Sequence, residues 1–188
     1  PFGLAGWTED NRSVLVYDKY DVWQLALDGS AKKLTEGAAD QIVHRYANTD
    51  PDAGNFGRRA DVDRSHYIDL SEDVYLSVRG EWTLNHGYAR LRAGRVEQLV
   101  YQDDNVGRLI KADDANVFAF VSQDFDDPPD YFATDRSFRS PRQVTSVNSF
   151  HGDYAWGHSE LVQYTNHQGR KLHGALFYPA DYDPGQSY

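Results

Sequence analysis

The residues with the clearest chemical potential form one short run, Arg79, Gly80, Glu81 and Trp82. A glutamate beside a tryptophan at the end of a strand can hold the amino terminus of a peptide, by charge on one side and stacking on the other. The simpler interpretation is a turn whose tryptophan packs between two sheets, and the residues alone favour it. Arg79, Glu81 and Trp82 are therefore weak candidates for substrate binding.

Side chains that bind metal ions are present, but they are not spaced as metal sites require. The seven histidines include no HxxxH or HxH pair, and metal sites need convergent ligands. The acidic group Asp124, Asp126, Asp127 and Asp130 lacks the glycine and terminal glutamate of a calcium loop, and Pro128-Pro129 indicates a stiff hairpin loop instead. The chain has no cysteine, which excludes disulfides and thiolate sites. We expect neither a metal nor a cofactor.

Short strands carry these residues, and the stretch from Trp7 to Gly37 shows their pattern best. Ser13–Tyr17 is rich in β-branched and aromatic side chains, which favour strands. Asp28-Gly29 is a strong hairpin signal, and it separates the strands predicted at Val22–Leu27 and Ala31–Thr35. Three such strands cannot bury both faces of their sheet alone, so the unit is expected to stack on others.

The same order of strands and turns recurs twice downstream. An aspartate opens one strand and a threonine closes the next, 14 residues apart from Asp21 to Thr35 and 15 apart from Asp130 to Thr145. Strands are predicted at 74–78, 87–91 and 96–100 in the middle copy, and at 117–121, 130–135 and 142–145 in the third.

Segments 41–46 and 106–111 supply a fourth strand for the middle and third copies. Four strands per repeat are typical of a β-propeller blade. The predicted fold is therefore all-β: a partial, open β-propeller of about three antiparallel four-stranded blades plus a C-terminal β-hairpin. The polar stretch 47–66 is predicted to be an insertion or a loop, after which Tyr67–Leu70 re-enters a strand.

Composition excludes several classes of protein. The formal net charge is −10 and the basic residues are scattered, which argues against a nucleic-acid partner. No run approaches the roughly 18 apolar residues that a membrane helix needs, so no membrane partner is expected. The chain starts at Pro1 and contains no methionine, which we interpret as an internal fragment. The compartment stays open between periplasm, secretion and cytoplasm.

The last stretch leaves the repeat. Two strands, Glu160–Thr165 and Leu172–Tyr178, are predicted to form a hairpin around the connection 166–171. Here the chain resembles the propeller-to-hydrolase junction of the prolyl oligopeptidase family of serine peptidases. The resemblance rests on Val144–Asn148, Ser159-Glu160, Gln168-Gly169, Gly174–Pro179 and Tyr182, and upstream on Trp7–Asp10, Tyr20–Trp23 and Leu34-Thr35.

The resemblance implies two parts, propeller blades over residues 1–156 and the truncated start of an α/β-hydrolase domain over 157–188. The family's nucleophile lies in a G-x-S-x-G elbow. The nearest approach here, Gly157-His158-Ser159-Glu160-Leu161, lacks the second glycine. No catalytic residue can be carried over, and the chain itself is expected to be inactive.

The implied role is that of a non-catalytic propeller that limits and orients the access of short peptides to a hydrolase domain. The implied partners are that missing hydrolase domain and a peptide substrate. The alternative is a stand-alone propeller-type module that binds a protein or a ligand.

An open arc exposes blade edges and faces that recruit partners, so self-association is possible. The hairpin is also expected either to self-associate or to fold back onto a blade. Either outcome would bury its apolar side chains, Leu161, Val162, Leu172, Leu176 and Phe177.

Overall fold

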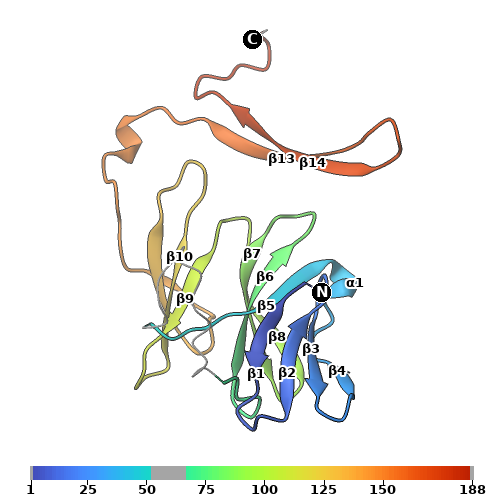
Figure 1. Cartoon of the computed structure of the whole chain (residues 1–188). Coiled ribbons are helices and arrows are strands. Elements are labelled where there is room, and N and C mark those ends of the chain that lie inside the picture. Colours follow the sequence, from blue (N-terminus) through green and yellow to red (C-terminus); the bar gives the residue numbers. More distant parts are fainter. Residues whose placement is uncertain (1, 52–66, 187–188) are drawn as a thin grey trace.

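The computed structural model describes residues 2–51 and 67–186 of the chain. These residues form four antiparallel sheets, three of four strands and one of two. Each strand pairs with its neighbours in sequence, so the order within every sheet is up-and-down. The predicted all-β fold, an open partial propeller with a terminal hairpin, is confirmed (Figure 1).

The first blade contains the strands of the sequence pattern and one more. Its elements are β1 (Leu4–Trp7), β2 (Ser13–Tyr17), β3 (Val22–Ala26) and β4 (Ala31–Lys33). The predicted Asp28-Gly29 turn is present, since Gly29 has a φ of +87° and the Ala26 N–H donates to the Ser30 carbonyl at 2.9 Å. Strand β1 was not predicted from the sequence.

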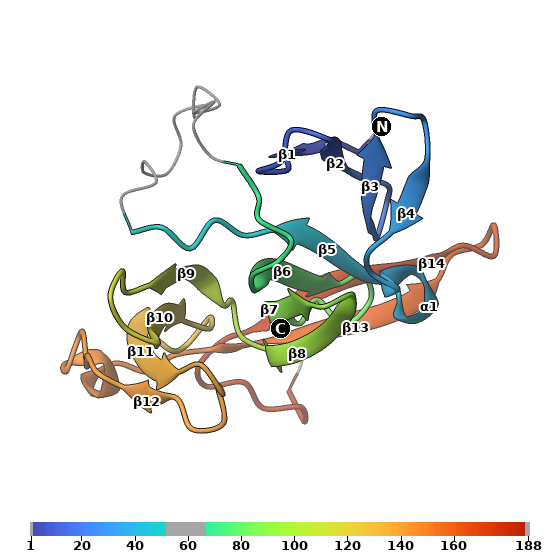
Figure 2. The same ribbon diagram turned by 90° about the horizontal axis from the view of Figure 1, so that it is seen from below.

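The middle and third blades repeat this plan. A short helix, α1 (Gly37–Asp40), leads into the middle blade, which contains β5 (Ile42–Tyr46), β6 (Val74–Gly80), β7 (His86–Arg92) and β8 (Arg95–Gln102). The third blade contains β9 (Gly107–Lys111), β10 (Val117–Ser122), β11 (Asp130–Asp135) and β12 (Arg142–Gln143). Figure 2 shows the three sheets side by side in an arc, with β4, β8 and β12 at its outer edge.

The segment predicted as a strand at Tyr67–Leu70 is not one. Ile68 forms a single parallel bridge with Thr8 of the first blade, and the chain then turns. The Ile68 N–H donates to the Trp7 carbonyl at 2.8 Å, so this point ties the first blade to the middle one. Most of the polar stretch predicted at 47–66 lies outside the described residues.

Two hydrophobic clusters hold the arc together, and the middle blade contributes to both. Alternate side chains of a strand point to opposite faces. Val74, Leu76 and Val78 of β6 therefore join Leu15 and the rest of the first cluster, which lies between the first and middle blades. Tyr75 and Tyr88 point the other way and pack with Val100, Val106, Leu109, Phe118, Phe120 and Phe138, between the middle and third blades.

The aspartate and threonine of the repeat pattern form a clamp within the first and third blades. Thr35 Oγ1 donates to Asp21 Oδ1 at 2.7 Å and accepts from the Val22 N–H at 3.0 Å. Thr145 Oγ1 donates to Asp130 Oδ1 at 2.6 Å and accepts from the Tyr131 N–H at 2.8 Å. In both blades the clamp fastens the chain after the outermost strand to the start of the strand beside it.

The terminal hairpin, β13 (His158–Thr165) and β14 (Lys171–Tyr178), lies across one end of the blades. We call this end the hairpin-side rim; it is formed by the turns at 18–21, 81–85, 103–106 and 123–129. The hairpin contacts the rim, which is one of its two expected outcomes, and self-association stays a prediction; within the chain itself the contact leaves three of its five apolar residues exposed. Leu172, Leu176 and Phe177 are exposed, and Leu161 and Val162 are half-buried.

None of the helices in the described ranges is long and apolar enough to cross a membrane.

Candidate functional site

The hairpin-side rim contains two of the three candidate residues picked out in the sequence. Glu81 and Trp82 lie in the turn between β6 and β7, directly below the hairpin. Glu81 reaches back to the first blade, where Lys19 Nζ donates to its Oε1 at 2.7 Å and the Tyr20 hydroxyl donates to its Oε2. The carboxylate therefore ties two blades together at the rim.

The same contacts set the charge of this cluster. Hydrogen bonds from Lys19 and Tyr20 hold the pKa of Glu81 below its usual value, because they favour the ionised carboxylate. The bond to Glu81 likewise raises the pKa of Lys19. Both groups are charged at neutral pH, and they neutralise each other before any peptide amine arrives.

Trp82 is the contact point between the rim and the hairpin. Its ring meets the ring of His173 edge-on, with centroids 5.5 Å apart, and its main-chain carbonyl accepts a hydrogen bond from Gln163 Nε2 at 2.9 Å. His173 and Gln163 lie directly opposite each other in the hairpin. One turn of the middle blade therefore contacts both strands of the hairpin.

Arg79, the third candidate, lies on β6 itself. Its side chain is exposed, and its register partners are Val43 on β5 and His86 on β7. The structure thus places all three candidates at one end of one blade. Substrate binding by Arg79, Glu81 and Trp82 stays a prediction.

The acidic group of the third blade has two structural uses. Asp130 belongs to the buried clamp, and its pKa is lowered chiefly by the hydrogen bond from Thr145. Asp124 and Asp127 exchange main-chain hydrogen bonds across the β10–β11 turn, in the hairpin loop that Pro128-Pro129 predicts. Within the described ranges, no group of three or more His, Asp or Glu side chains is arranged to hold a metal ion.

Phe125, in the same turn, is a second contact for the hairpin. Its ring lies 5.3 Å from that of Phe177 of β14, measured between centroids. The hairpin therefore spans the rim from the middle blade to the third. Trp82 and Phe125 both lie in turns, so the hairpin contacts the ends of the blades and not the interior of a sheet.

Four of the described histidines contact main chain or aromatic rings, one of them being His173 against Trp82. His44 is buried, its Nδ1 lies 3.0 Å from the Ile42 carbonyl, and burial lowers its pKa. His151 stacks on Trp156, and His158 stacks on Tyr178. His66 lies outside the described residues.

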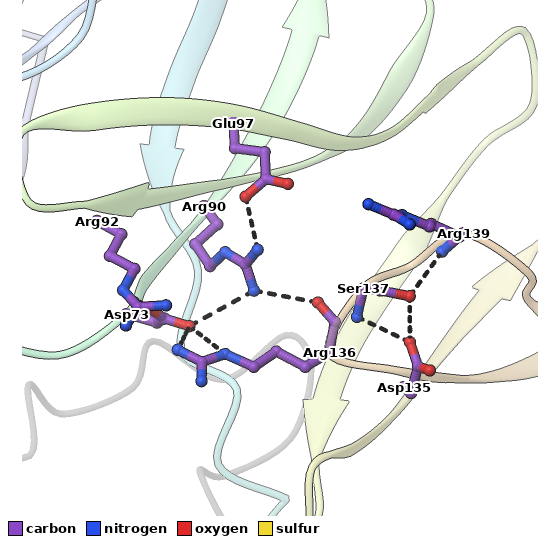
Figure 3. Close-up of polar contacts among 8 residues, drawn as sticks. All are labelled: Asp73, Arg90, Arg92, Glu97, Asp135, Arg136, Ser137 and Arg139. Atoms are coloured by element: carbon purple, nitrogen blue, oxygen red, sulfur yellow. Dashed lines mark hydrogen bonds and ion pairs between the residues drawn. The ribbon is translucent and has the colours of Figure 1, made fainter.

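A charged network at the opposite end of the blades was missed by the sequence analysis (Figure 3). Asp73, just before β6, accepts hydrogen bonds from Arg136 Nε at 2.9 Å and Nη2 at 2.6 Å. Arg90 lies between them: its Nη1 is 3.5 Å from Asp73 Oδ2 and donates to the Arg136 carbonyl at 3.0 Å, while its Nη2 donates to Glu97. The network joins the middle blade to the third.

An open polar hollow of about 340 Å³ lies beside the innermost strands, at the end away from the hairpin. It is lined by Tyr46, Asn48, Thr49, Asp50, Pro51, Tyr67, Lys111, Ala112 and Asp113. Its lining is mostly polar and comes from the middle and third blades, so it is a feature of their junction.

No protein-family model matches the sequence, and no curated protein matches it. Among solved structures the chain is similar to a variant of the isopeptidase AtxE2 with Astexin3-dC4 bound. The TM-score is 0.50 and the identity 14%, over 88% of this chain and 30% of that one. This likeness shows the fold. The chain therefore shares its fold with part of a peptidase structure.

Two further solved structures are similar over much of the chain. One is AtxE2 without ligand, with a TM-score of 0.48 and 13% identity over 88% of this chain and 31% of that one. The other is a prolyl endopeptidase, with a TM-score of 0.46 and 13% identity over 94% of this chain and 31% of that one. The chain spans less than a third of the length of each of the three.

Proposed function

We propose that the chain is the propeller portion of a prolyl oligopeptidase-like serine peptidase, and that it limits and orients the access of short peptides to a hydrolase domain. The observation that carries the proposal is the hairpin β13–β14, which follows the last blade and lies across the rim. The resemblance to the family's junction falls on this hairpin and the residues around it. The fold shared with an isopeptidase supports the same reading.

The proposed boundary between the two parts lies at 156/157. In the described part of the chain, β13 and β14 pair only with each other, while every strand of residues 4–143 belongs to a blade. Between them, residues 144–157 contain no strand. Residues 157–188 are thus proposed to belong to the hydrolase domain, and residues 1–156 to the propeller.

The contacts at the rim support the proposed control of peptide access to the hydrolase domain. Trp82 and Phe125 hold the hairpin at two points, on the middle and third blades. A hydrolase domain carried by the hairpin would therefore lie over the blade ends, and a peptide would have to pass between them. The charged and aromatic side chains of the rim would contact the peptide before it reached the nucleophile of the hydrolase domain.

The first test concerns chemistry. The coding sequence after Tyr188 should encode a G-x-S-x-G elbow followed by an aspartate and a histidine. The full-length protein should be labelled by a serine-reactive fluorophosphonate, while the 188-residue chain should not. A downstream sequence without an elbow would refute the peptidase proposal and favour the stand-alone binding module.

The second test concerns access and uses the full-length protein. Replacing Trp82 with alanine removes the ring that holds the hairpin against the middle blade. We expect kcat/KM for long peptides to rise while that for a dipeptide-sized substrate stays unchanged, because only long peptides are restricted by the opening. Tyr164→Ala, on the opposite face of the hairpin, is the matched control. An equal change for both lengths would refute the gating role.

A further inference from the structure

The tip of the β7–β8 hairpin carries two arginines side by side. Arg92 and Arg95 are register partners across the turn Ala93-Gly94, and both are exposed. Like charges directly opposite each other in a sheet are destabilising. Arg92 has one distant partner, since its Nε lies 3.5 Å from Asp73 Oδ1. The Arg95 guanidinium has no hydrogen bond or ion pair with any described residue, so the repulsion between the two arginines is poorly compensated within the described part of the chain.

A further arginine reaches the same place from the third blade. Figure 3 shows Arg136 on the other side of Asp73 from Arg92, with Arg90 between the two blades. Arg136 uses its Nε and Nη2 on Asp73, which leaves its Nη1 without a partner among the described residues, and its side chain is 40% exposed. We call Arg90, Arg92, Arg95 and Arg136 the arginine corner.

Buried polar atoms beneath the corner also lack partners. Arg90 Nε and Thr134 Oγ1 have no hydrogen bond within the described ranges, although the Arg90 side chain and Thr134 are no more than 10% exposed. Thr134 lies two positions before Arg136 and points into the junction of the middle and third blades. The third such atom is Asp73 Oδ1, the acceptor of the long ion pair. Buried polar groups are almost always hydrogen-bonded, so this junction has donors to spare.

The charges at the corner do not balance. Its four guanidinium groups face two carboxylates, those of Asp73 and Glu97, which leaves an excess of two positive charges. Asp135 and Arg139, shown beside them in Figure 3, add one charge of each sign and leave this excess unchanged. The excess is local, because the whole chain has a formal net charge of −10. An anion with two charges and several acceptor oxygens would neutralise it.

We propose that the arginine corner binds a doubly charged oxyanion of the phosphate class. Guanidinium groups donate paired hydrogen bonds that match the geometry of phosphate, and such bonds are strong because both partners are charged. The anion would lie between Arg92, Arg95 and Arg136 and would offset the repulsion at the hairpin tip. Since Arg136 belongs to the third blade and the other two to the middle one, a bound anion would also hold these blades together.

The test is a titration of the 188-residue chain with sodium phosphate at constant ionic strength, followed by calorimetry and by NMR of the arginine Nε–H signals. We expect one saturable site, with the largest shifts at Arg92, Arg95 and Arg136. Millimolar phosphate is too dilute for the general stabilising effect of phosphate salts, which acts by exclusion from the protein surface. Chloride at the same ionic strength should give neither the heat nor the shifts. Equal responses to both anions would indicate charge screening alone and would overturn the proposal.

Arg95→Gln removes one arginine of the corner at an exposed position. It should weaken phosphate binding about tenfold or more, because a charge-assisted contact is lost. Without phosphate its Tm should equal or exceed that of the unsubstituted chain, since a like-charged neighbour is removed. Arg12→Gln, in an exposed turn of the first blade, removes the same charge elsewhere and should bind phosphate unchanged. Unaltered binding in Arg95→Gln, or an equal loss in both variants, would overturn the proposal. So would a Tm of Arg95→Gln that is equally lowered with and without phosphate, since Arg95 would then be structural.

A nucleoside monophosphate, titrated in the same way, distinguishes two sources of the anion. Equal affinity for it and for inorganic phosphate supports a site for the phosphate group alone. Tighter binding of the nucleotide, still weakened by Arg95→Gln, supports a phosphate group carried by a larger molecule. Failure of both to bind would overturn the proposal. The site lies at the end of the blades away from the hairpin, so none of these outcomes bears on the proposed peptidase function.

Discussion

At the scale of single residues, two aspartates stabilise the ends of strands, because their carboxylates accept hydrogen bonds from a threonine hydroxyl and from main-chain N–H groups. Asp21 accepts from Thr35 Oγ1 and from the Gly37 N–H, at 2.7 and 2.5 Å. Asp130 accepts from Thr145 and from the Val147 N–H, at 2.6 and 3.1 Å. Each therefore satisfies donors that would otherwise be left unpaired where the chain leaves its outermost strand.

Replacing the threonine of a clamp should reduce stability, and the loss should depend on how buried that threonine is. Thr35→Val keeps the shape of the side chain but leaves the Val22 N–H and the Asp21 carboxylate short of a partner, and Asp21 and Thr35 are each only 1% exposed. We expect a loss of about 3 kcal/mol in the free energy of unfolding, measured by urea denaturation.

The equivalent change in the third blade is the matched comparison. Thr145 is half-buried, so water can replace the lost hydrogen bonds, and Thr145→Val should cost only about 1 kcal/mol. Equal losses in the two blades would contradict this account of the clamp.

The Glu81 cluster predicts a dependence on pH. The pKa of Glu81 is lowered in the folded chain, so its contribution to stability is present above the unfolded value of 4.5 and is lost as the pH falls through the lower folded value. Glu81→Gln should therefore lower Tm at neutral pH, and this difference in Tm should shrink when the melts are repeated at about pH 3.

The control for this measurement is Glu72→Gln, at an exposed position on the opposite rim. It should leave Tm nearly unchanged at both pH values. A Glu81→Gln difference that stayed constant with pH would mean that packing, not charge, joins the first two blades at this point.

At the scale of elements, most strands could be predicted from the sequence, but the short strand β1 and the isolated bridge at Ile68 could not. The recurring order of strands and turns predicted β6, β7 and β10 to within two residues at each end, because every blade repeats the same local plan. Strand β1 escaped because Leu4–Trp7 is short, contains a glycine and pairs with a register shift. Ile68 looked like part of a strand but forms one bridge.

The candidate site shows where prediction from sequence ends. The run from Arg79 to Trp82 was visible as a turn at a strand end, which is where it lies. Its partners were not visible, because Lys19 is 62 positions from Glu81 and Gln163 is 81 from Trp82. Asp73 and Arg136 are likewise 63 positions apart. Such contacts depend on how blades stack, and no local pattern encodes that.

Docking of the hairpin is an element-scale property that can be measured. Trp82→Ala removes the ring contact with His173, so amide exchange across β13 and β14 should accelerate. Exchange in β6 and β7 should not change, because the turn at Trp82 lies outside the blade cores. Tyr164→Ala, on the hairpin face that points away from the rim, is the matched control. Equal acceleration in both variants would show that the rim does not hold the hairpin.

At the scale of the whole molecule, the blades are joined by apolar clusters and by a few charged links. Asp73 and Arg90 of the middle blade, whose side chains are both 10% exposed, form the buried part of one such link. Arg136 extends it to the third blade, and Glu97 accepts a hydrogen bond from Arg90 Nη2. Only the contacts of Arg136 cross to the third blade, so these contacts require the two blades to be together.

Asp73→Asn should weaken that junction more than an ordinary surface change. It leaves three guanidinium groups, those of Arg90, Arg92 and Arg136, without their shared carboxylate, and that of Arg90 is buried, so we expect a loss of about 3 kcal/mol in the free energy of unfolding. Asp69→Asn, in an exposed turn on the same rim, should cost well under about 1 kcal/mol. Similar losses from both changes would show that the network adds nothing specific to the blade junction.

Strand β6 contributes side chains to both hydrophobic clusters, and this affects the order in which the blades unfold. Its neighbouring side chains belong to different clusters, so a fluctuation that releases the first or third blade still leaves one side of β6 covered. Unfolding should then proceed inward from either end, as in a linear array with nearest-neighbour coupling. Native-state exchange would record this as a gradient of protection that peaks at β6 and β7, the last part of the chain to lose its order.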